Sequence, residues 1–225
     1  MLVYEISEIN KTFRTPENWD EITLSQYAEF IEAVTALTDK LKADDKSESG
    51  FYEIVLSYRS EFNRIIRAFT GLNEKTINQV NAEDIYSVYV QLTTFLSAPE
   101  FKPIKRFKFK NKYYYLPESA KDYFGNEIEM GKATFGEVVE ALQITNLNDS
   151  FKNNKFSALP YQIAILCRPK NEAYDDQKVA DRAKMFGGLP MSVVWNISFF
   201  LMKPQINYLN RFLKSLEAKP TAKPV

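Results

Sequence analysis

The chain contains no histidine, and this absence excludes more chemistry than any other feature of its composition. Histidine is the side chain most often used for proton transfer near neutral pH, and it is the commonest metal ligand. Without it, serine–histidine and cysteine–histidine nucleophile pairs are excluded, as are the signatures of zinc deaminases and metalloproteases. We therefore expect a protein that is not an enzyme and has no catalytic, cofactor-binding or metal-binding residues.

Cysteine and glycine are also scarce. Cys167 is the one cysteine among 225 residues, so neither an intrachain disulfide nor a cysteine-rich metal site can form. It ends the apolar run Ile163–Cys167, which is typical of a small buried side chain and not of a reactive thiol. None of the seven glycines belongs to a phosphate-binding loop, and Gly187 and Gly188 predict a turn.

Long apolar runs and net charge are missing too. The most apolar stretch, Met191 to Met202, has 12 residues, whereas a membrane-spanning helix needs ~20. The first residues have neither the basic nor the apolar region of a secretory signal. Because 29 basic residues balance 29 acidic ones, no overall field favours nucleic acid or a membrane surface. We expect a soluble protein of the cytoplasm with neither as its partner.

What the chain does contain is similarity between its two halves. Four short blocks recur in the same order about a hundred residues apart: Asn10–Glu17 with Asn111–Glu118, Tyr27–Val34 with Phe135–Leu142, Arg64–Glu74 with Gln162–Glu172, and Ser87–Leu96 with Ser192–Leu201. This pattern predicts an α+β, mainly α-helical fold of two tandem similar units, residues 1–100 and 101–203. Each unit is expected to be a β-hairpin followed by about three helices, and the two to be related by a pseudo-two-fold axis. The hairpins are expected to pair into one four-stranded antiparallel sheet, because a lone hairpin is marginal in water.

Local signals give the expected elements of the first unit. Residues 2–16 predict a β-ribbon, and Thr23 with Gln26 has the spacing of a capping box that begins a helix. Residues 51–69 predict one helix that stops at Gly71, because glycine favours the helix C-terminus. A short helix over 73–79 and a third long helix over 82–96 follow.

The second unit repeats the order. Alternating residues predict a hairpin over 106–115, and Thr134 with Glu137 again has capping-box spacing, before a helix over 134–144. Further helices are expected over 159–167, with Pro160 in its first turn, and over 174–186 and 190–202. Trp195 is expected in the core. Residues 204–225 are expected to be a short helix and a disordered tail rich in lysine and proline.

The densest charge pattern precedes and enters the second hairpin, where cations alternate with aromatic rings. Such rows hold single-stranded nucleic acid in some proteins, but the signature of RNA-recognition sheets is absent. A solvent-facing strand protected by lysines, or a surface for an acidic protein partner, are the other interpretations. Trp19 either fixes the chain before the first helix or is an exposed anchor for a partner. The candidate partner-binding residues are Trp19, Lys105, Arg106, Phe107, Lys108, Phe109, Lys110 and Tyr114.

A pair of carboxylates stands out in the sequence Tyr174-Asp175-Asp176. Such a pair binds magnesium in polymerase active sites, where a third carboxylate completes the site. Here the pair precedes a predicted helix, and acidic residues favour the positive end of a helix dipole. We interpret it as structural, with a magnesium-dependent enzyme acting on nucleic acid as a remote alternative.

The segment Pro16–Thr23, followed by Gln26-Tyr27, resembles the opening of small tail-assembly-chaperone-like proteins encoded by tailed bacteriophages, notably those of Bacteroidetes hosts. The resemblance extends over most of residues 16–202, through Ile66–Leu72, Asn111–Tyr114, Thr134–Glu137 and Cys167–Pro169. Cys167 stands where an aromatic residue is expected before Arg-Pro. The resemblance implies a non-enzymatic morphogenesis protein that binds the tape measure protein or another tail or virion protein in the infected host's cytoplasm. It brings no catalytic residues.

Two hypotheses of this kind remain open. The chain is an assembly chaperone absent from finished particles, or it is a permanent virion component such as a connector, ring or internal protein. A homo-oligomer is compatible with both. In the first hypothesis, a partner's apolar segment is expected to bind in aromatic grooves between the two units.

Overall fold

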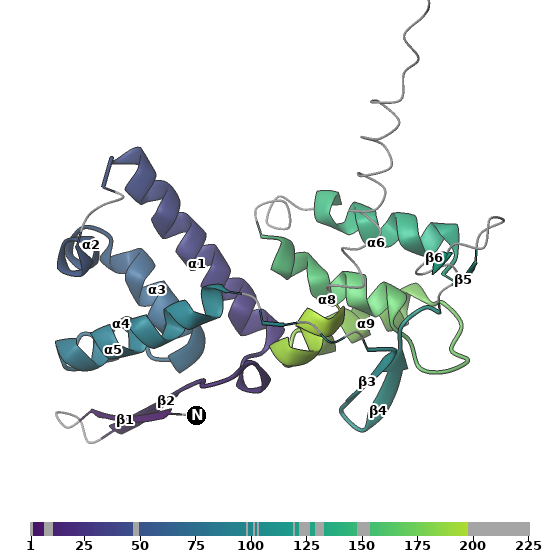
Figure 1. Ribbon diagram of the computed structural model, residues 1–225, viewed down its shortest axis with the longest axis horizontal. Coiled ribbons are helices and arrows are strands. Elements are labelled where there is room, and N and C mark those ends of the chain that lie inside the picture. The colour runs from purple at the N-terminus through teal and green to yellow at the C-terminus, as the bar shows by residue number, and fades with distance from the viewer. Residues whose placement is uncertain are drawn as a thin grey trace, which may run out of the picture.

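The computed structural model describes residues 2–6, 11–46, 50–97, 99–100, 102, 104–118, 120–121, 127–128, 133–147 and 154–197 (Figure 1). The described part is mainly α-helical, with three two-stranded antiparallel sheets. The predicted α+β, mainly α-helical class is therefore confirmed. The predictions for the end of the last helix and for residues 204–225 concern residues outside the described ranges.

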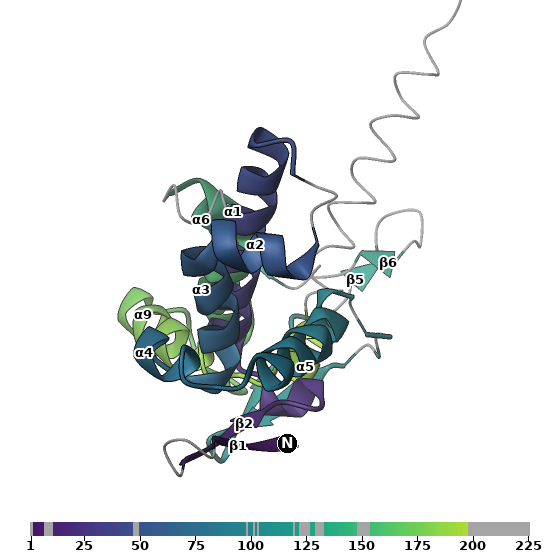
Figure 2. The same cartoon turned by 90° about the vertical axis from the view of Figure 1, so that its left-hand side faces the viewer.

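The N-terminal half consists of one hairpin and a set of helices. Its elements are β1 (Leu2–Ile6), β2 (Lys11–Thr15), the 3-10 turn η2 (Trp19–Glu21), α1 (Leu24–Ala43), α2 (Phe51–Ser57), α3 (Arg59–Thr70), α4 (Glu74–Ile77), α5 (Ala82–Thr93) and the 3-10 turn η3 (Thr94–Leu96). In two views at right angles, α5 lies between α1 and the hairpin (Figures 1 and 2). Gln91 ties α5 to the hairpin, because its Oε1 accepts from Thr15 Oγ1 at 2.8 Å and its Nε2 donates to Pro16 O at 2.7 Å.

The C-terminal half repeats this order with a second hairpin. Its elements are β3 (Arg106–Phe109), β4 (Lys112–Tyr115), β5 (Ala120–Lys121), β6 (Glu127–Ile128), α6 (Phe135–Leu147), α8 (Lys155–Leu166) and α9 (Asp176–Phe186), followed by helical residues 191–197. Lys110 and Asn111 both have positive φ, of 44° and 64°, which is the backbone that a tight two-residue hairpin turn requires. The predicted hairpin over 106–115 is therefore confirmed, with its turn at Lys110 and Asn111.

Both predicted capping boxes are present. Thr23 Oγ1 accepts from Gln26 N and the Gln26 side chain accepts from Thr23 N, while Thr134 and Glu137 make the same exchange before α6. Gly71 ends α3 with φ of 68°, a left-handed conformation that a side chain disfavours. These local signals set the helix ends as expected.

Two helix predictions were wrong in detail. Residues 51–69 are not one helix, because Tyr58 leaves helical geometry (φ −128°, ψ 38°) and divides α2 from α3. The Tyr58 hydroxyl donates to the Asp44 carboxylate, so a contact distant in sequence holds the break. Pro160 is the sixth residue of α8, not part of its first turn, because Asn154 caps the helix further upstream.

The predicted four-stranded sheet was also wrong. β1 pairs only with β2, and β3 only with β4, among the strands of the described residues. The outer edge of β4 is occupied by Arg168, since Tyr115 N donates to Arg168 O at 2.9 Å and Arg168 N to Tyr115 O at 3.3 Å. Each hairpin buries one face on its own half, with Phe13 in the first and Phe107 in the second among the core residues.

The start of α1 joins the two halves. A helix leaves its first N–H groups without intrahelical partners. Here Leu24 N donates to Leu189 O at 2.8 Å and Ser25 N to Gly187 O at 2.9 Å, while Met191 N donates back to Ile22 O at 2.8 Å. The side chains of Ile22, Leu24, Leu189 and Met191 at this backbone exchange are fully buried, and one hydrophobic core extends through both halves.

The order of the helices agrees with the proposed duplication, but their arrangement does not establish the symmetry. α1 packs on α3 as α6 packs on α8. A two-fold relation would match the contact between α1 and α8 with one between α6 and α3, and no contact of similar extent occurs among the described residues. The pseudo-two-fold arrangement is therefore not confirmed.

Candidate partner-binding groove

An apolar groove of about 150 Å³ opens in the N-terminal half, between α1, α2 and α5. Small-molecule sites usually enclose ~300–1,000 Å³, so the space suits side chains of a protein segment better than a cofactor. Its lining is almost entirely aliphatic and aromatic, and comes mainly from Val34, Leu37 and Leu41 of α1, Ile54 of α2, and Tyr89, Leu92 and Leu96 of α5 and η3.

The helical repeat of α1 explains why the groove forms. Phe30, Val34, Leu37 and Leu41 recur at intervals of three and four, so they share one face of the helix. α3 covers the inner part of this face, where Phe30 contacts Phe69 at a ring distance of 4.7 Å. The break at Tyr58 keeps α2 separate from α3, and the outer part of the same face stays open.

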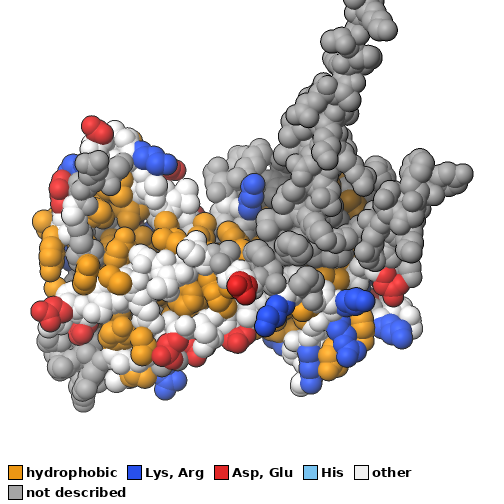
Figure 3. Space-filling model, in the orientation of Figure 1, with side chains coloured by type: hydrophobic (Ala, Val, Ile, Leu, Met, Phe, Trp, Pro, Cys, Tyr) orange, Lys and Arg blue, Asp and Glu red, His pale blue; other side chains and the backbone are white. Residues whose placement is uncertain are grey.

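Large apolar side chains on α2, α5 and η3 are exposed to solvent, and one of them, Leu96, is 46% exposed and lines the groove. Tyr52 and Leu56 on α2 are 68% and 83% exposed, and Tyr86 and Val90 on α5 are 47% and 46% exposed. Each pair is spaced i, i+4, so its members lie on one helix face. Figure 3 shows apolar side chains gathered over this half of the molecule. Contiguous exposed apolar surface of this kind marks sites of protein interaction.

The two halves carry opposite charge, which the zero net charge conceals. Residues 1–100 contain 9 Lys or Arg and 17 Asp or Glu, a net charge of −8. Residues 101–225 contain 20 and 12, a net charge of +8. The groove therefore lies in the acidic half, and a basic segment is the better electrostatic match for it.

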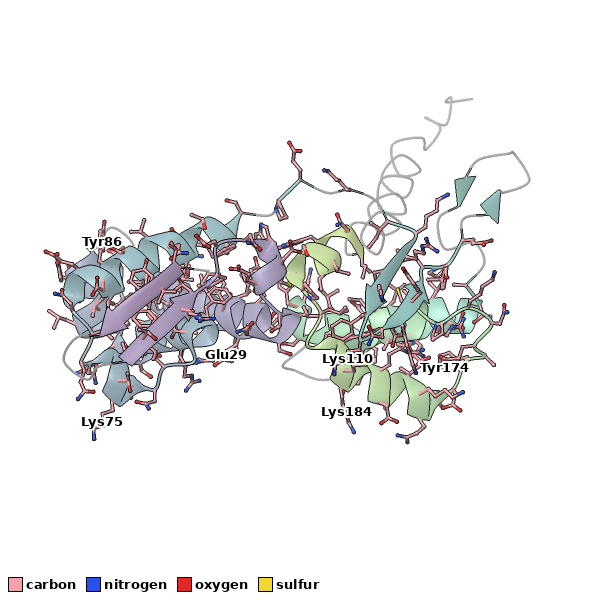
Figure 4. The ribbon with its side chains drawn as sticks, turned by 90° about the horizontal axis from the view of Figure 1, so that it is seen from below. Glu29, Lys75, Tyr86, Lys110, Tyr174 and Lys184 are labelled. Carbon is pink, nitrogen blue, oxygen red and sulfur yellow. The ribbon has the colours of Figure 1, made fainter. Side chains whose placement is uncertain are left out.

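The structure divides the candidate residues of the second hairpin between its two faces. The exposed face carries Lys105, Arg106, Lys108 and Lys110, and Arg106 and Lys108 lie over the Tyr113 ring at 5.0 and 5.9 Å. The blue side chains of Figure 3 gather over β3 and β4, and Figure 4 shows Lys110 and Tyr86 in opposite halves. This basic face is separate from the groove.

The aromatic candidates of that hairpin lie on its other face. Phe107 and Tyr114 are 5% and 3% exposed and contact Phe186, while Phe109 is half-buried against the same ring. Phe107 and Tyr114 were therefore wrongly placed on a partner surface. They anchor the hairpin to α9.

Trp19 is also a structural residue. It is half-buried, and its ring contacts Tyr27, Phe95 and Trp195 at 5.5, 5.0 and 5.5 Å. These rings fill the junction of the two halves, where a partner groove was expected. The groove instead lies within one half. The apolar repeat from Phe30 to Leu41 along α1 was the sequence signal for it.

Three further ionisable groups, those of Asp175, Cys167 and Tyr174, have structural roles or are buried. Asp175 accepts from Lys178 N at 2.9 Å and caps α9, as the structural interpretation of the carboxylate pair predicts. Burial raises the pKa of the Cys167 thiol to about 12, which keeps it protonated at neutral pH. Burial and the hydrogen bond to Glu140 raise the pKa of Tyr174 as well. No cluster of three or more His, Cys, Asp or Glu able to hold a metal is found among the described residues.

No family model, curated protein or solved structure matches the chain. In the part of the chain that the structure describes, no helix is both long enough and apolar enough to cross a membrane.

Proposed function

We propose that the chain is a non-enzymatic bacteriophage morphogenesis protein, in particular a tail assembly chaperone that binds an apolar segment of the tape measure protein or another tail protein. The observation that carries this proposal is the apolar groove, whose lining residue Leu96 is 46% exposed, together with the exposed Tyr86 and Val90 on α5. Amphipathic helices bind in grooves of this kind through anchors at helical spacing. The resemblance of Pro16–Thr23 to phage tail-assembly-chaperone-like proteins supports the biological setting, which is the cytoplasm of an infected bacterium.

The net charge of the N-terminal half limits the kind of partner segment that suits the groove. A net charge of −8 over residues 1–100 favours a segment that carries lysine or arginine beside its apolar face. The proposed ligand is therefore a basic amphipathic helix.

We also propose that the two halves arose by duplication of one hairpin-plus-helices unit. The recurring sequence blocks and the shared order of capping box, packed helix pair and final helix support this. In this proposal the N-terminal copy keeps an apolar groove open.

Co-expression with the tail proteins tests the function. The wild-type chain is expected to capture the tape measure protein, and Leu96→Glu is expected to weaken capture about tenfold or more, as loss of an interface hot spot does. Leu96 lines the groove and is 46% exposed, so this substitution acts at the groove and is expected to leave the fold intact. Leu142→Glu, at a 43% exposed leucine of α6, is the matched control and is expected to bind normally. Recovery of the wild-type chain without any tail protein would contradict the proposal.

A permanent virion component is the second candidate function. The exposed apolar side chains favour it as well, because neighbouring subunits of a particle, including further copies of this chain, would cover them. Mass spectrometry of purified particles separates the two functions. Absence of the chain from particles is expected for a chaperone, whereas stoichiometric presence would establish the virion component.

A further inference from the structure

The sequence of residues 206–217, Ile-Asn-Tyr-Leu-Asn-Arg-Phe-Leu-Lys-Ser-Leu-Glu, has the pattern of an amphipathic helix. At about 100° per residue, the six apolar residues fall on one half of a helical wheel and the six polar residues on the other. The apolar half consists of Ile206, Tyr208, Leu209, Phe212, Leu213 and Leu216. This segment lies outside the described residues.

The length of this pattern matches the groove. The residues of α1 that line the groove run from Phe30 to Leu41, which at 1.5 Å per residue is about 16 Å. A helix from Ile206 to Glu217 spans the same number of residues and the same length.

Charge is complementary as well. Residues 203–225 contain five Lys or Arg and a single Glu, a net charge of +4, whereas residues 1–100 carry −8. On α2 and α5, Glu53 and Glu83 are exposed close to the apolar Tyr52 and Tyr86. Residues 206–217 themselves contain Arg211, Lys214 and Glu217, a net charge of +1, and the flanking lysines supply the rest. The tail as a whole therefore has the chemistry of the basic amphipathic ligand that the groove favours.

The end of the described chain lies within reach of the groove. Trp195 contacts Trp19 at 5.5 Å, and Trp19 contacts Phe95 at 5.0 Å, next to the groove-lining Leu96. The eight residues 198–205 span up to ~27 Å when extended. A segment tethered this close has an effective concentration far above that of a free copy.

We propose that residues 206–217 occupy the groove of their own chain, with the apolar half of the segment against α1, α2 and α5. Occupancy hides the exposed apolar surface until a partner segment displaces it. This regulatory role rests on the proposed function, but occupancy itself is measured without any partner. Failure of occupancy and failure of partner capture are therefore distinguishable.

Disulfide crosslinking in the full-length chain tests the proposal. The variant Leu96→Cys with Leu213→Cys places one thiol in the lining of the groove and one on the apolar half of the segment. Cys167 does not interfere, because it is 1% exposed and burial raises its pKa. An intramolecular disulfide is expected, seen as a faster-migrating monomer on non-reducing gels, at a rate independent of protein concentration.

The control pairs Leu213→Cys with Leu142→Cys, at an exposed apolar position of the C-terminal half. Crosslinking at Leu96 is expected to be at least about tenfold faster than at Leu142, reflecting the difference in effective concentration. Equal rates would overturn the proposal. A crosslinked dimer whose rate rises with protein concentration would also overturn it and would assign the groove to a second copy.

A second measurement uses an apolar dye and no cysteine. In the full chain, Leu209→Glu with Phe212→Glu is expected to release the segment and to raise dye fluorescence severalfold. Asn207→Glu with Asn210→Glu makes the same charge change on the polar half and is expected to leave fluorescence unchanged. Equal fluorescence of the two double variants would overturn the proposal.

Discussion

The two halves of the molecule use their ion pairs differently. In the N-terminal half, Arg67 with Glu29 and Arg64 with Glu32 join α3 to α1 across solvent-exposed surface, at 2.9 and 2.7 Å. In the C-terminal half, Arg168 binds Glu137 at 2.6 Å, and the glutamate is only 6% exposed. Exposed pairs contribute ~0–1 kcal/mol, whereas a buried charge that loses its partner is costly.

The same difference extends to the corresponding capping boxes. Neutral Gln26 caps α1 and has no further charged partner in its box. Glu137, in the equivalent position of α6, accepts from Thr134 N and also binds Arg168. The C-terminal half is thus fixed by specific buried polar contacts, while the N-terminal half relies on apolar packing and leaves part of its apolar surface open. Of these two arrangements, only the open apolar surface of the N-terminal half is suited to the exchange of a bound segment.

The largest expected effect comes from the aromatic anchor of the C-terminal half. Phe186 is fully buried and contacts the rings of Phe107, Phe109 and Tyr114. Phe186→Ala is expected to lower the free energy of unfolding by ~3–5 kcal/mol, because it leaves a cavity. Urea denaturation followed by circular dichroism measures this. Leu56→Ala, in the open surface of the other half, is expected to change it by no more than ~0.5 kcal/mol. Similar losses for both variants would contradict the contrast between the halves.

The ion pairs give the next largest difference. Glu137→Gln is expected to cost ~2–3 kcal/mol, somewhat less than for a fully buried pair because Arg168 keeps 23% exposure. Glu29→Gln is expected to cost under ~1 kcal/mol, and that small loss is expected to disappear in 1 M salt, where screening acts within ~3 Å. Thermal denaturation at low and high salt measures both. A larger loss from Glu29→Gln would reverse the comparison.

Sequence reasoning succeeded where a structure depends on neighbouring residues. The capping boxes at Thr23 and Thr134, the helix stop at Gly71, and the burial of Cys167 and Trp195 were all predicted correctly. Each follows from side chains within a few positions, or from an apolar run.

Features set by distant contacts were missed. Tyr58 breaks a continuous helical pattern because its hydroxyl reaches Asp44, and α8 starts early because Asn154 also donates to Ala28 O at 2.6 Å. The four-stranded sheet does not form because Arg168 takes the edge of β4. The groove was placed between the halves because the sequence gives no sign that Trp19 and Trp195 fill that junction.

The backbone exchange between the halves gives a smaller, more specific effect. A Cβ added to Gly187 would lie 2.5 Å from Ser25 Oγ, too close for contact. Because this oxygen is the end of an exposed side chain that can rotate away, Gly187→Ala is expected to cost no more than ~1 kcal/mol. Because Ser25→Ala removes the clashing oxygen, the double variant Gly187→Ala with Ser25→Ala is expected to recover most of that loss. A double-mutant cycle by urea denaturation measures the coupling, and additive effects would show that this junction is not tightly packed.

The smallest expected effects come from one glycine in each half, and they have opposite signs. Gly71→Ala is expected to cost ~1 kcal/mol, because φ is 68° and a side chain disfavours the left-handed region. Gly136 lies in the first turn of α6 with no heavy atom within 4 Å of an added Cβ, so Gly136→Ala is expected to gain ~0.5 kcal/mol by restricting the unfolded chain. Thermal unfolding of the two variants measures both signs. Neither change touches a core contact. Changes in the free energy of unfolding that have the same sign for both variants would therefore mean that the backbone at one of these two helix ends differs from the one described.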